Sequence, residues 1–195
     1  PKTWFWGTGD GGTGLVMRRQ LPAFSPLPAA AWFRSLGPSM LGPDASREEL
    51  ARTLEARFDA TGSVLTRSGT QALQLALRLV SRGDGDPVVV ALPAYSCFDL
   101  VTAAVGAGVQ VVFYDMDPVT LGPEPESLSR ALETGVRAVV AGNLFGYPLD
   151  WGTLLEECRN RDVLVIEDAA QGIGTSWRSL PGGTLGHMTV LSFGR

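Results

Sequence analysis

The sequence is poor in several kinds of residue, and each shortage argues against a class of protein. Its two cysteines, Cys97 and Cys158, are too few for a disulfide framework, so we expect reduced thiols in a cytoplasmic protein. No apolar run approaches the roughly 20 residues of a membrane span, and no basic-then-apolar signal segment opens the sequence, so we expect no membrane contact. The formal charge of −4 argues against a nucleic-acid groove, which needs clustered basic side chains.

Lysine and histidine are the scarcest titratable residues. Lysine and arginine together number 16, but Lys2 is the only lysine. His187 is the only histidine, and because it stands between Gly186 and Met188 we interpret it as a loop residue without a catalytic role. Any chemistry that needs a side-chain amine is therefore restricted to one position in these residues.

A regular alternation of apolar runs and helical stretches is present instead. A chain of 195 residues that is 45% hydrophobic can bury one substantial core, so we expect a single domain. Apolar runs predict strands at residues 88–92, 109–113, 136–141, 163–166 and 189–191. Helical stretches are predicted between the first four, near residues 97–107, 124–134 and 150–161. This alternation predicts a mainly parallel sheet covered by helices on both faces, which is a three-layer α/β/α fold.

Local signals predict where several helices begin. Ser46-Arg47-Glu48-Glu49 has the form of a capping box, and the apolar residues that follow it would lie on one face of a helix. Ser68-Gly69-Thr70 opens a long apolar helix over residues 71–80. Pro125 suits the first turn of a helix, and Asp150 suits an N-cap.

Polar side chains stand where the predicted strands end. In open parallel sheets, ligands bind beyond the carboxyl ends of the strands, which lie at one edge. The polar residues at these ends are Tyr95, Ser96, Asp115, Asp117, Asn143 and Asp168. We therefore expect a ligand site at this edge of the sheet.

Asp168 is the most informative of these residues. It ends a buried apolar run, where a carboxylate costs free energy unless a partner meets it. It could cap local backbone N–H groups, or it could pair with a protonated ring nitrogen and so let the ring accept electrons from a carbanion. Gln171, three residues on, could reach the edge of such a ring. Ser192, after the last strand, could bind a phosphate or could be a solvated strand end.

The helix start at Ser68-Gly69-Thr70 complements Asp168. Ser68 could be an ordinary N-cap, or the free N–H groups of the first turn could hold a phosphate. A ligand with a phosphate at one end and a protonatable ring nitrogen at the other would use both places. Pyridoxal phosphate is a cofactor of this kind.

A second glycine-rich stretch suggests a dinucleotide site but lacks the context for one. Residues 1–20 form an N-terminal segment rich in glycine and aromatic residues, in which Gly7–Gly12 fits the pattern G-x-G-x-x-G. No amphipathic helix follows before Pro22, and Ala30 stands near the place of the expected ribose-binding acid. A Rossmann oxidoreductase is therefore a distant alternative.

Taken together, the motifs resemble the DegT/DnrJ/EryC1/StrS family of pyridoxal-phosphate-dependent sugar aminotransferases. The matching runs are residues 68–73, 93–96, 115–118, 144–146, 167–171 and 191–195. The match is strong from about residue 60 onward, loose over 21–59 and absent in 1–20. The resemblance implies the large domain of a fold-type-I aminotransferase over residues 21–195, with a mixed seven-stranded sheet and without the small C-terminal domain.

The resemblance also implies roles for cofactor-binding residues. Ser68-Gly69-Thr70 and Ser192 would hold the phosphate. Asp168 would pair with the pyridine nitrogen, and Gln171 would lie at the ring edge.

At two positions this sequence departs from the family pattern. The family commonly stacks an aromatic side chain on the cofactor ring, but Cys97 stands at that position, so stacking would come from Phe98 or Tyr95, or would be weak. The family's histidine before Leu144 is Asn143 here, which leaves the role of that position open.

The family's Schiff-base lysine lies five residues after the serine that matches Ser192, which is two positions past Arg195. We therefore expect the sequence to be the N-terminal part of a longer enzyme, inactive alone and without a catalytic residue of its own. Lys2 is no substitute, because nothing around it resembles the setting of that lysine.

Three functions remain open. The first is transamination of a keto sugar, nucleotide-linked, with an amino acid such as glutamate as donor. A histidine in place of the missing lysine would indicate a sugar dehydratase of the same family, and a non-catalytic α/β binding domain is the third possibility. The resemblance also implies a homodimer, and Trp4-Phe5-Trp6 is an apolar cluster suited to an interface.

Overall fold

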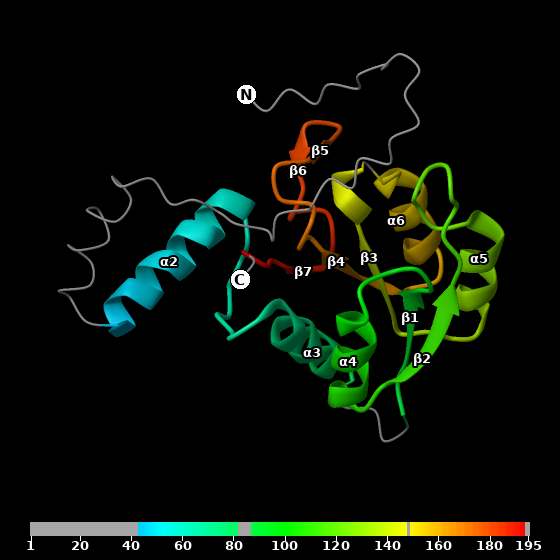
Figure 1. Cartoon of the computed structure of the whole chain (residues 1–195), viewed down its shortest axis with the longest axis horizontal. Coiled ribbons are helices and arrows are strands. Elements are labelled where there is room, and N and C mark those ends of the chain that lie inside the picture. The colour runs from blue at the N-terminus through cyan, green and yellow to red at the C-terminus, as the bar shows by residue number, and fades with distance from the viewer. Residues whose placement is uncertain (1–42, 82–86, 148, 194–195) are drawn as a thin grey trace, which may run out of the picture.

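The computed structural model describes residues 43–81, 87–147 and 149–193 (Figure 1). At its centre is a five-stranded sheet in the order β2-β1-β3-β4-β7. The strands are β1 (Val89–Pro93), β2 (Gln110–Tyr114), β3 (Ala138–Gly142), β4 (Leu164–Asp168) and β7 (Met188–Val190). All five predicted strands are confirmed. Within the described ranges every neighbouring pair in this sheet is parallel, whereas the resemblance implied a mixed sheet of seven strands.

Helices cover both faces of the sheet (Figure 1). α3 (Gly69–Val80) and α4 (Asp99–Ala107) pack on one face, and α5 (Pro125–Glu133) and α6 (Trp151–Arg159) pack on the other. The buried side chains accordingly form two clusters, one on each side of the sheet. The predicted three-layer α/β/α fold is confirmed.

Strand β3 shows why the strands are continuous apolar runs in the sequence. Ala138, Val139, Val140 and Ala141 are all buried. Val139 and Ala141 belong to the cluster with α5 and α6, whereas Ala138 and Val140 belong to the cluster with α3 and α4. Because successive side chains of a strand point to opposite faces, a strand covered on both faces is apolar at every position.

Helix α2 (Pro43–Phe58) begins three residues before the predicted capping box, so the predicted helix start at Ser46 is wrong. Proline fits the first turn of a helix, where its missing N–H has no role, and this early start places Ser46 inside the helix. The predicted apolar face is only partly covered: Leu50 is 46% exposed, and Ala51 and Leu54 are half-buried. Among the described side chains of α2 only Phe58 is buried, and its ring contacts Gly183 in the loop before β7.

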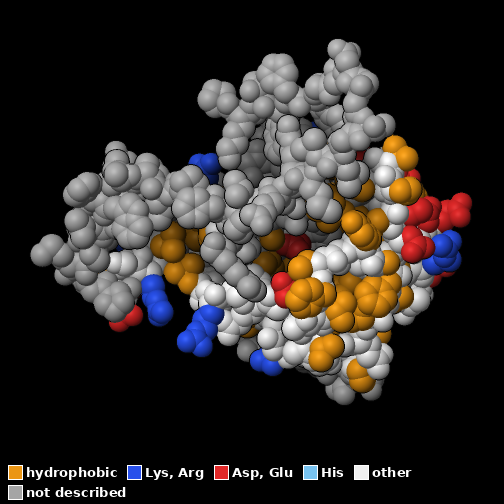
Figure 2. Space-filling view, viewed as in Figure 1, with side chains coloured by type: hydrophobic (Ala, Val, Ile, Leu, Met, Phe, Trp, Pro, Cys, Tyr) orange, Lys and Arg blue, Asp and Glu red, His pale blue; other side chains and the backbone are white. Residues whose placement is uncertain are grey.

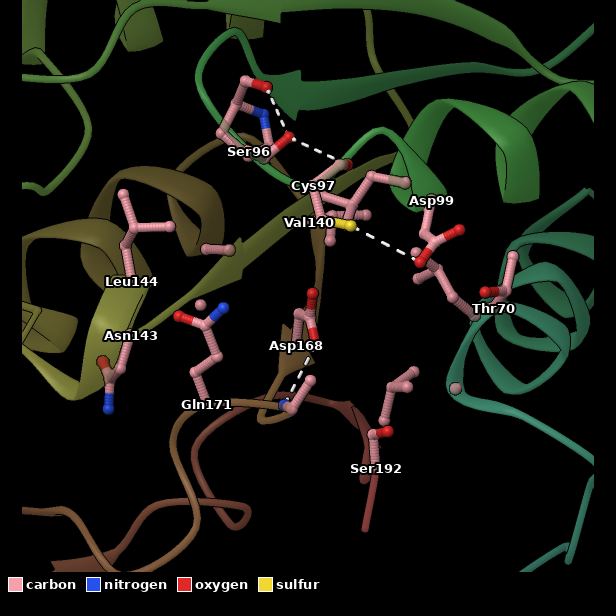
Figure 3. Close-up of a pocket in the computed structure, with 18 of the residues that line it drawn as sticks. Thr70, Ser96, Cys97, Asp99, Val140, Asn143, Leu144, Asp168, Gln171 and Ser192 are labelled. Atoms are coloured by element: carbon pink, nitrogen blue, oxygen red, sulfur yellow. Dashed lines mark hydrogen bonds between the residues drawn. The ribbon is translucent and has the colours of Figure 1, made fainter. Parts of the chain in front are cut away.

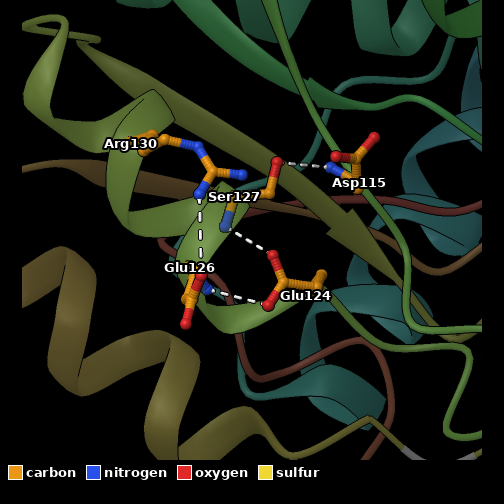
Figure 4. Close-up of polar contacts among 5 residues, drawn as sticks. All are labelled: Asp115, Glu124, Glu126, Ser127 and Arg130. Atoms are coloured by element: carbon orange, nitrogen blue, oxygen red, sulfur yellow. Dashed lines mark hydrogen bonds and ion pairs between the residues drawn. The ribbon is translucent and has the colours of Figure 1, made fainter.

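The start of α5 is held by a residue that the sequence did not single out (Figure 4). The carboxylate of Glu124 accepts the N–H groups of Glu126 and Ser127 at 3.1 and 2.6 Å. Pro125 occupies the first turn, as predicted. The Ser127 hydroxyl accepts the N–H of Asp115 at 2.9 Å, which joins this helix to the end of β2.

The sequence also gave no sign of the short hairpin of β5 (Ser176–Trp177) and β6 (Leu180–Pro181). Both turn residues, Arg178 and Ser179, have positive φ, 46° and 70°. Glycine and asparagine favour that conformation, so the usual signal for such a turn is missing here. The Arg178 guanidinium lies 4.5 Å from the centroid of the Trp177 ring, in a cation–π contact.

Several predictions lie outside the described residues. They concern the segment 1–20, with its glycine-rich stretch Gly7–Gly12 and its aromatic cluster Trp4-Phe5-Trp6, and also Lys2. Within the described ranges, no helix is long and apolar enough to cross a membrane. The same ranges contain no group of three or more His, Cys, Asp or Glu side chains placed to hold a metal ion.

Replacing Glu124 by alanine removes both acceptors at the start of α5. We expect the free energy of unfolding to fall by about 1 kcal/mol, as for loss of other helix N-caps. Urea denaturation followed by circular dichroism measures this change. Glu133→Ala, at the exposed opposite end of the same helix, is the matched control and should change the value by less than about 0.5 kcal/mol. Equal losses for the two variants would contradict the capping role.

Candidate functional site

A cavity of about 430 Å³ opens at the carboxyl edge of the sheet, beside the first turn of α3 (Figure 3). The predicted site residues that line it are Ser68, Gly69, Thr70, Cys97, Asn143, Asp168, Gln171 and Ser192. Phe98 is not among the lining residues, and its side chain is 76% exposed. Asp115 and Asp117, after β2, also lie outside the lining. The structure therefore brings most of the predicted site together, from segments more than 100 residues apart.

Asp168 is the last residue of β4 and has a strand on each side, pairing with Gly142 of β3 and Val190 of β7. Its Oδ1 accepts the N–H of Ala170 at 3.1 Å, so one of its two oxygens caps a local backbone N–H group, as one of the two predicted roles required. The ion pairs formed by the described residues all lie elsewhere. Burial raises the pKa of Asp168, the Ala170 N–H opposes this rise, and the charge of Glu167 adds to it. A ligand that presents a cationic N–H would stabilise this carboxylate.

The first turn of α3 faces the same cavity. The Ser68 hydroxyl accepts the N–H of Gln71 at 3.2 Å, so this side chain is an N-cap. The N–H groups of Gly69 and Thr70 have no acceptor within the helix, because the first N–H groups of a helix lack one. Ser192 lies against this turn: a Cβ atom added to Gly69 would be 3.1 Å from the Ser192 Cβ and 3.3 Å from its Oγ. Because Gly69 has no side chain, the Ser192 hydroxyl can lie close to the free N–H groups of the first turn of α3.

Gln171 joins the cavity wall to a strained turn, η1 (Leu144–Gly146). Its Oε1 accepts the N–H of Phe145 at 2.5 Å. Phe145 has φ of +54°, a conformation that costs a side-chain-bearing residue roughly 1–2 kcal/mol. This hydrogen bond stabilises the turn. It also fixes the orientation of the Gln171 amide, because Oε1 is occupied as an acceptor and the NH₂ group is left to donate to a ligand.

Asn143, directly after β3, lines the cavity and connects the segments around it through the hydrogen bonds of its side chain. Its Nδ2 donates to the Thr175 hydroxyl at 2.8 Å. Its Oδ1 accepts the Leu149 N–H at 3.3 Å and the Trp151 indole N–H at 3.2 Å. The side chain is 5% exposed, so its amide works mainly as a junction between the segments around it.

Cys97, where the resemblance implies a stacking aromatic, lines the cavity. Its thiol donates to Oδ2 of Asp99 at 3.4 Å. Tyr95 also lines the cavity, so of the two aromatic residues considered for stacking the structure brings Tyr95, and not Phe98, to the cavity. Asp99 and Arg67 line the cavity as well and were not predicted. Asp99 could have been noticed as an acidic residue that opens a helix, whereas nothing in the sequence marks Arg67.

Tyr114 is a buried lining residue that the sequence did not single out. Its hydroxyl donates to the Val140 carbonyl at 2.8 Å and so links β2 to β3. Burial raises the pKa of Tyr114 far above its usual value, so the phenol stays protonated and structural. His187 lies outside the cavity, where its Nδ1 accepts the Val165 N–H at 3.0 Å. This placement agrees with its interpretation as a loop residue.

Comparison with known proteins identifies the family. The model of the DegT/DnrJ/EryC1/StrS aminotransferase family matches residues 31–194. The chain belongs to this family. It is 33% identical over 148 residues to the dTDP-4-dehydro-2,3,6-trideoxy-D-glucose 4-aminotransferase of Saccharopolyspora spinosa, covering 73% of this chain and 38% of that protein. It is 31% identical over 131 residues to the GDP-perosamine synthase of Caulobacter vibrioides, covering 67% of this chain and 35% of that protein.

Solved structures share the fold of this DegT/DnrJ/EryC1/StrS chain. An aminotransferase from Psychrobacter cryohalolentis matches with a TM-score of 0.68 and 27% identity, over 75% of this chain and 36% of that one. A 3-amino-5-hydroxybenzoic acid synthase matches with a TM-score of 0.75 and 25% identity, over 88% of this chain and 46% of that one. The large-domain fold of the type I aminotransferases is therefore confirmed. The chain spans less than half the length of each of these four relatives.

The raised pKa of Asp168 predicts that its charge destabilises the ligand-free protein. The Asp168 carboxyl binds its proton more tightly in the folded state than in the unfolded state. The loss of stability caused by its charge is therefore absent below the ordinary aspartate pKa and complete above the raised pKa of the folded protein. Asp168→Asn should therefore raise the melting temperature at pH 7, and the gain should shrink as the pH falls to about 4. Thermal unfolding at both pH values measures this. Asp115→Asn is the control, and a lower melting temperature for Asp168→Asn at pH 7 would contradict the prediction.

Proposed function

We propose that this chain binds pyridoxal phosphate and forms the cofactor-binding part of an aminotransferase. Its substrate would be a keto sugar, nucleotide-linked, and an amino acid such as glutamate would donate the amino group. The proposal rests on one observation: the half-buried Asp168 carboxylate faces the same cavity as the first turn of α3. These two features suit the ring nitrogen and the phosphate of a single cofactor.

The residues present fit the cofactor at both ends. The cavity of about 430 Å³ lies within the range usual for small-molecule sites. The N–H groups of Gly69 and Thr70 and the hydroxyl of Ser192 are donors at the positive end of α3, where an anion is stabilised. Asp168 would accept the ring N–H, and the free NH₂ group of Gln171 would donate to an oxygen at the ring edge.

When bound, pyridoxal phosphate supplies an electron sink for a substrate carbanion. Asp168 maintains that capacity, because its ionised carboxylate holds a proton on the ring nitrogen. The partly buried position of Asp168 strengthens the contact, since water screens it less than at an exposed site. The bond from Phe145 holds the Gln171 amide in the orientation that presents its NH₂ group.

The relatives support a sugar substrate. The Saccharopolyspora and Caulobacter proteins are both named for nucleotide-linked sugars, and both are more than 30% identical to this chain. A structure of an Escherichia coli GDP-4-keto-6-deoxy-D-mannose-3-dehydratase matches at 23% identity, which supports the shared fold alone. Aminotransfer is therefore the leading reaction, and dehydration is the alternative.

An apolar surface on α4 supports self-association. Phe98, Val101 and Val105 follow one another at helical spacing and are 76%, 39% and 74% exposed. Figure 2 shows hydrophobic side chains gathered on the side of the molecule where β1, β2 and α4 lie in Figure 1. Such a surface is typical of an interface, and we infer a homodimer.

Titration with pyridoxal phosphate, followed by its absorbance, tests the cofactor site. Asp168→Asn removes the charged acceptor, so we expect its affinity to fall roughly ten- to a hundredfold. Asp115→Asn, just after β2 at the same edge of the sheet but outside the cavity, should bind as the unaltered chain does. Equal affinities for the two variants would overturn the assignment of Asp168. A non-catalytic domain predicts no change in absorbance on addition of the cofactor.

Borohydride reduction tests the place of the nucleophile. Lys2 is the only lysine in the 195 residues, so cofactor reduced onto this polypeptide should be found only at Lys2 or the terminal amine. We expect no transamination by this polypeptide alone, with binding at the cavity reversible and non-covalent. Peptide mapping after reduction locates the label, and robust turnover by residues 1–195 would contradict the expectation.

A further inference from the structure

Glu167, next to Asp168 in β4, is the only charged side chain that is buried among the described residues, at 1% exposure. Its Oε1 accepts the N–H of Gly183 at 2.7 Å. Its Oε2 accepts the N–H groups of Leu185 and Gly186 at 2.8 and 3.4 Å, and the hydroxyl of Thr189 at 3.4 Å. Three of these four donors belong to the backbone of the loop that leads into β7. One carboxylate therefore holds that loop in place.

Close backbone approach makes this arrangement possible. A Cβ atom added to Gly186 would lie 2.7 Å from the Met188 carbonyl oxygen and 2.8 Å from the backbone nitrogen of Glu167. Gly183 has φ of +102°, and a Cβ atom there would lie 2.7 Å from the ring of Phe58. The loop is thus tightly packed between β4 and the end of α2, and Glu167 supplies acceptors for N–H groups that would otherwise be buried without them.

The loop determines where β7 begins, and β7 determines where Ser192 lies. β7 has three residues and pairs with β4 from Ile166↔Met188 to Asp168↔Val190. Ser192 comes two residues later, and its Oγ is close to the first turn of α3 at Gly69. Because so short a strand has few ladder bonds, its position depends on the bonds that Glu167 makes just before it.

We propose that Glu167 is a positioning residue for phosphate binding, which sets the Ser192 hydroxyl against the first turn of α3 through its bonds to the loop. This proposal rests on the proposed function, because it assumes that Ser192 and α3 bind the cofactor phosphate. A purely stabilising role for Glu167 would leave the preference for the phosphorylated ligand unchanged.

The test compares pyridoxal phosphate with pyridoxal, which lacks the phosphate, on the 195-residue chain. Ser192→Ala and Glu167→Gln should each weaken pyridoxal phosphate binding about tenfold and leave pyridoxal binding unchanged. Glu167→Gln keeps the size of the side chain but replaces one acceptor oxygen with a donor. In the double variant, Glu167→Gln should add less than about twofold to the effect of Ser192→Ala, because both act on one contact.

Thr189→Val is a milder test, because it removes only one donor to Glu167. We expect its affinity for pyridoxal phosphate to fall two- to threefold. This loss should disappear when Ser192 is also replaced by alanine. If Glu167→Gln does not fold, Thr189→Val alone decides the question. Additive losses, or a lower melting temperature with an unchanged preference for pyridoxal phosphate over pyridoxal, would overturn the positioning role. Absence of pyridoxal phosphate binding by the unaltered chain would instead overturn the proposed function.

Discussion

Burial of the parallel sheet on both faces is the constraint on which the rest of this structure depends. With α3 and α4 on one side and α5 and α6 on the other, a polar side chain inside a strand needs partners of its own. Polar residues therefore gather at the carboxyl edge, where the cavity opens. Glu167 is a fully buried charge inside a strand, and it is tolerated because four donors surround its carboxylate.

Much of the fold and part of the site could be predicted because they follow from this constraint. Continuous apolar runs mark strands covered on both faces, and chain direction brings Asp168 and the helix start at Ser68 to one edge. The capping box at Ser46 failed as a predictor because a proline earlier in the chain had already begun the helix. The turn at Arg178 and Ser179 escaped notice because neither residue type usually adopts positive φ.

Other roles depend on tertiary partners and could not be inferred from local sequence. Asn143 bonds to Thr175, 32 positions away, and Glu167 bonds to Gly183, 16 positions away. Glu167 and Asp168 are adjacent in the same strand, and no local pattern separates their roles. One carboxylate has both oxygens bonded to the protein, whereas the other accepts a single N–H and faces the cavity. The surroundings, and not the residue type, decide which of the two is available to a ligand.

The bond between Trp151 and Asn143 gives the chain an intrinsic optical signal. Trp151 is completely buried, and its indole N–H donates to the side-chain amide of Asn143, which lines the cavity. An indole in such surroundings emits at shorter wavelength than one in water, and pyridoxal compounds absorb in the same near-ultraviolet region. Energy transfer from Trp151 to a bound pyridoxal ring would quench that emission. The unlabelled protein therefore contains its own fluorescence donor beside the ligand cavity.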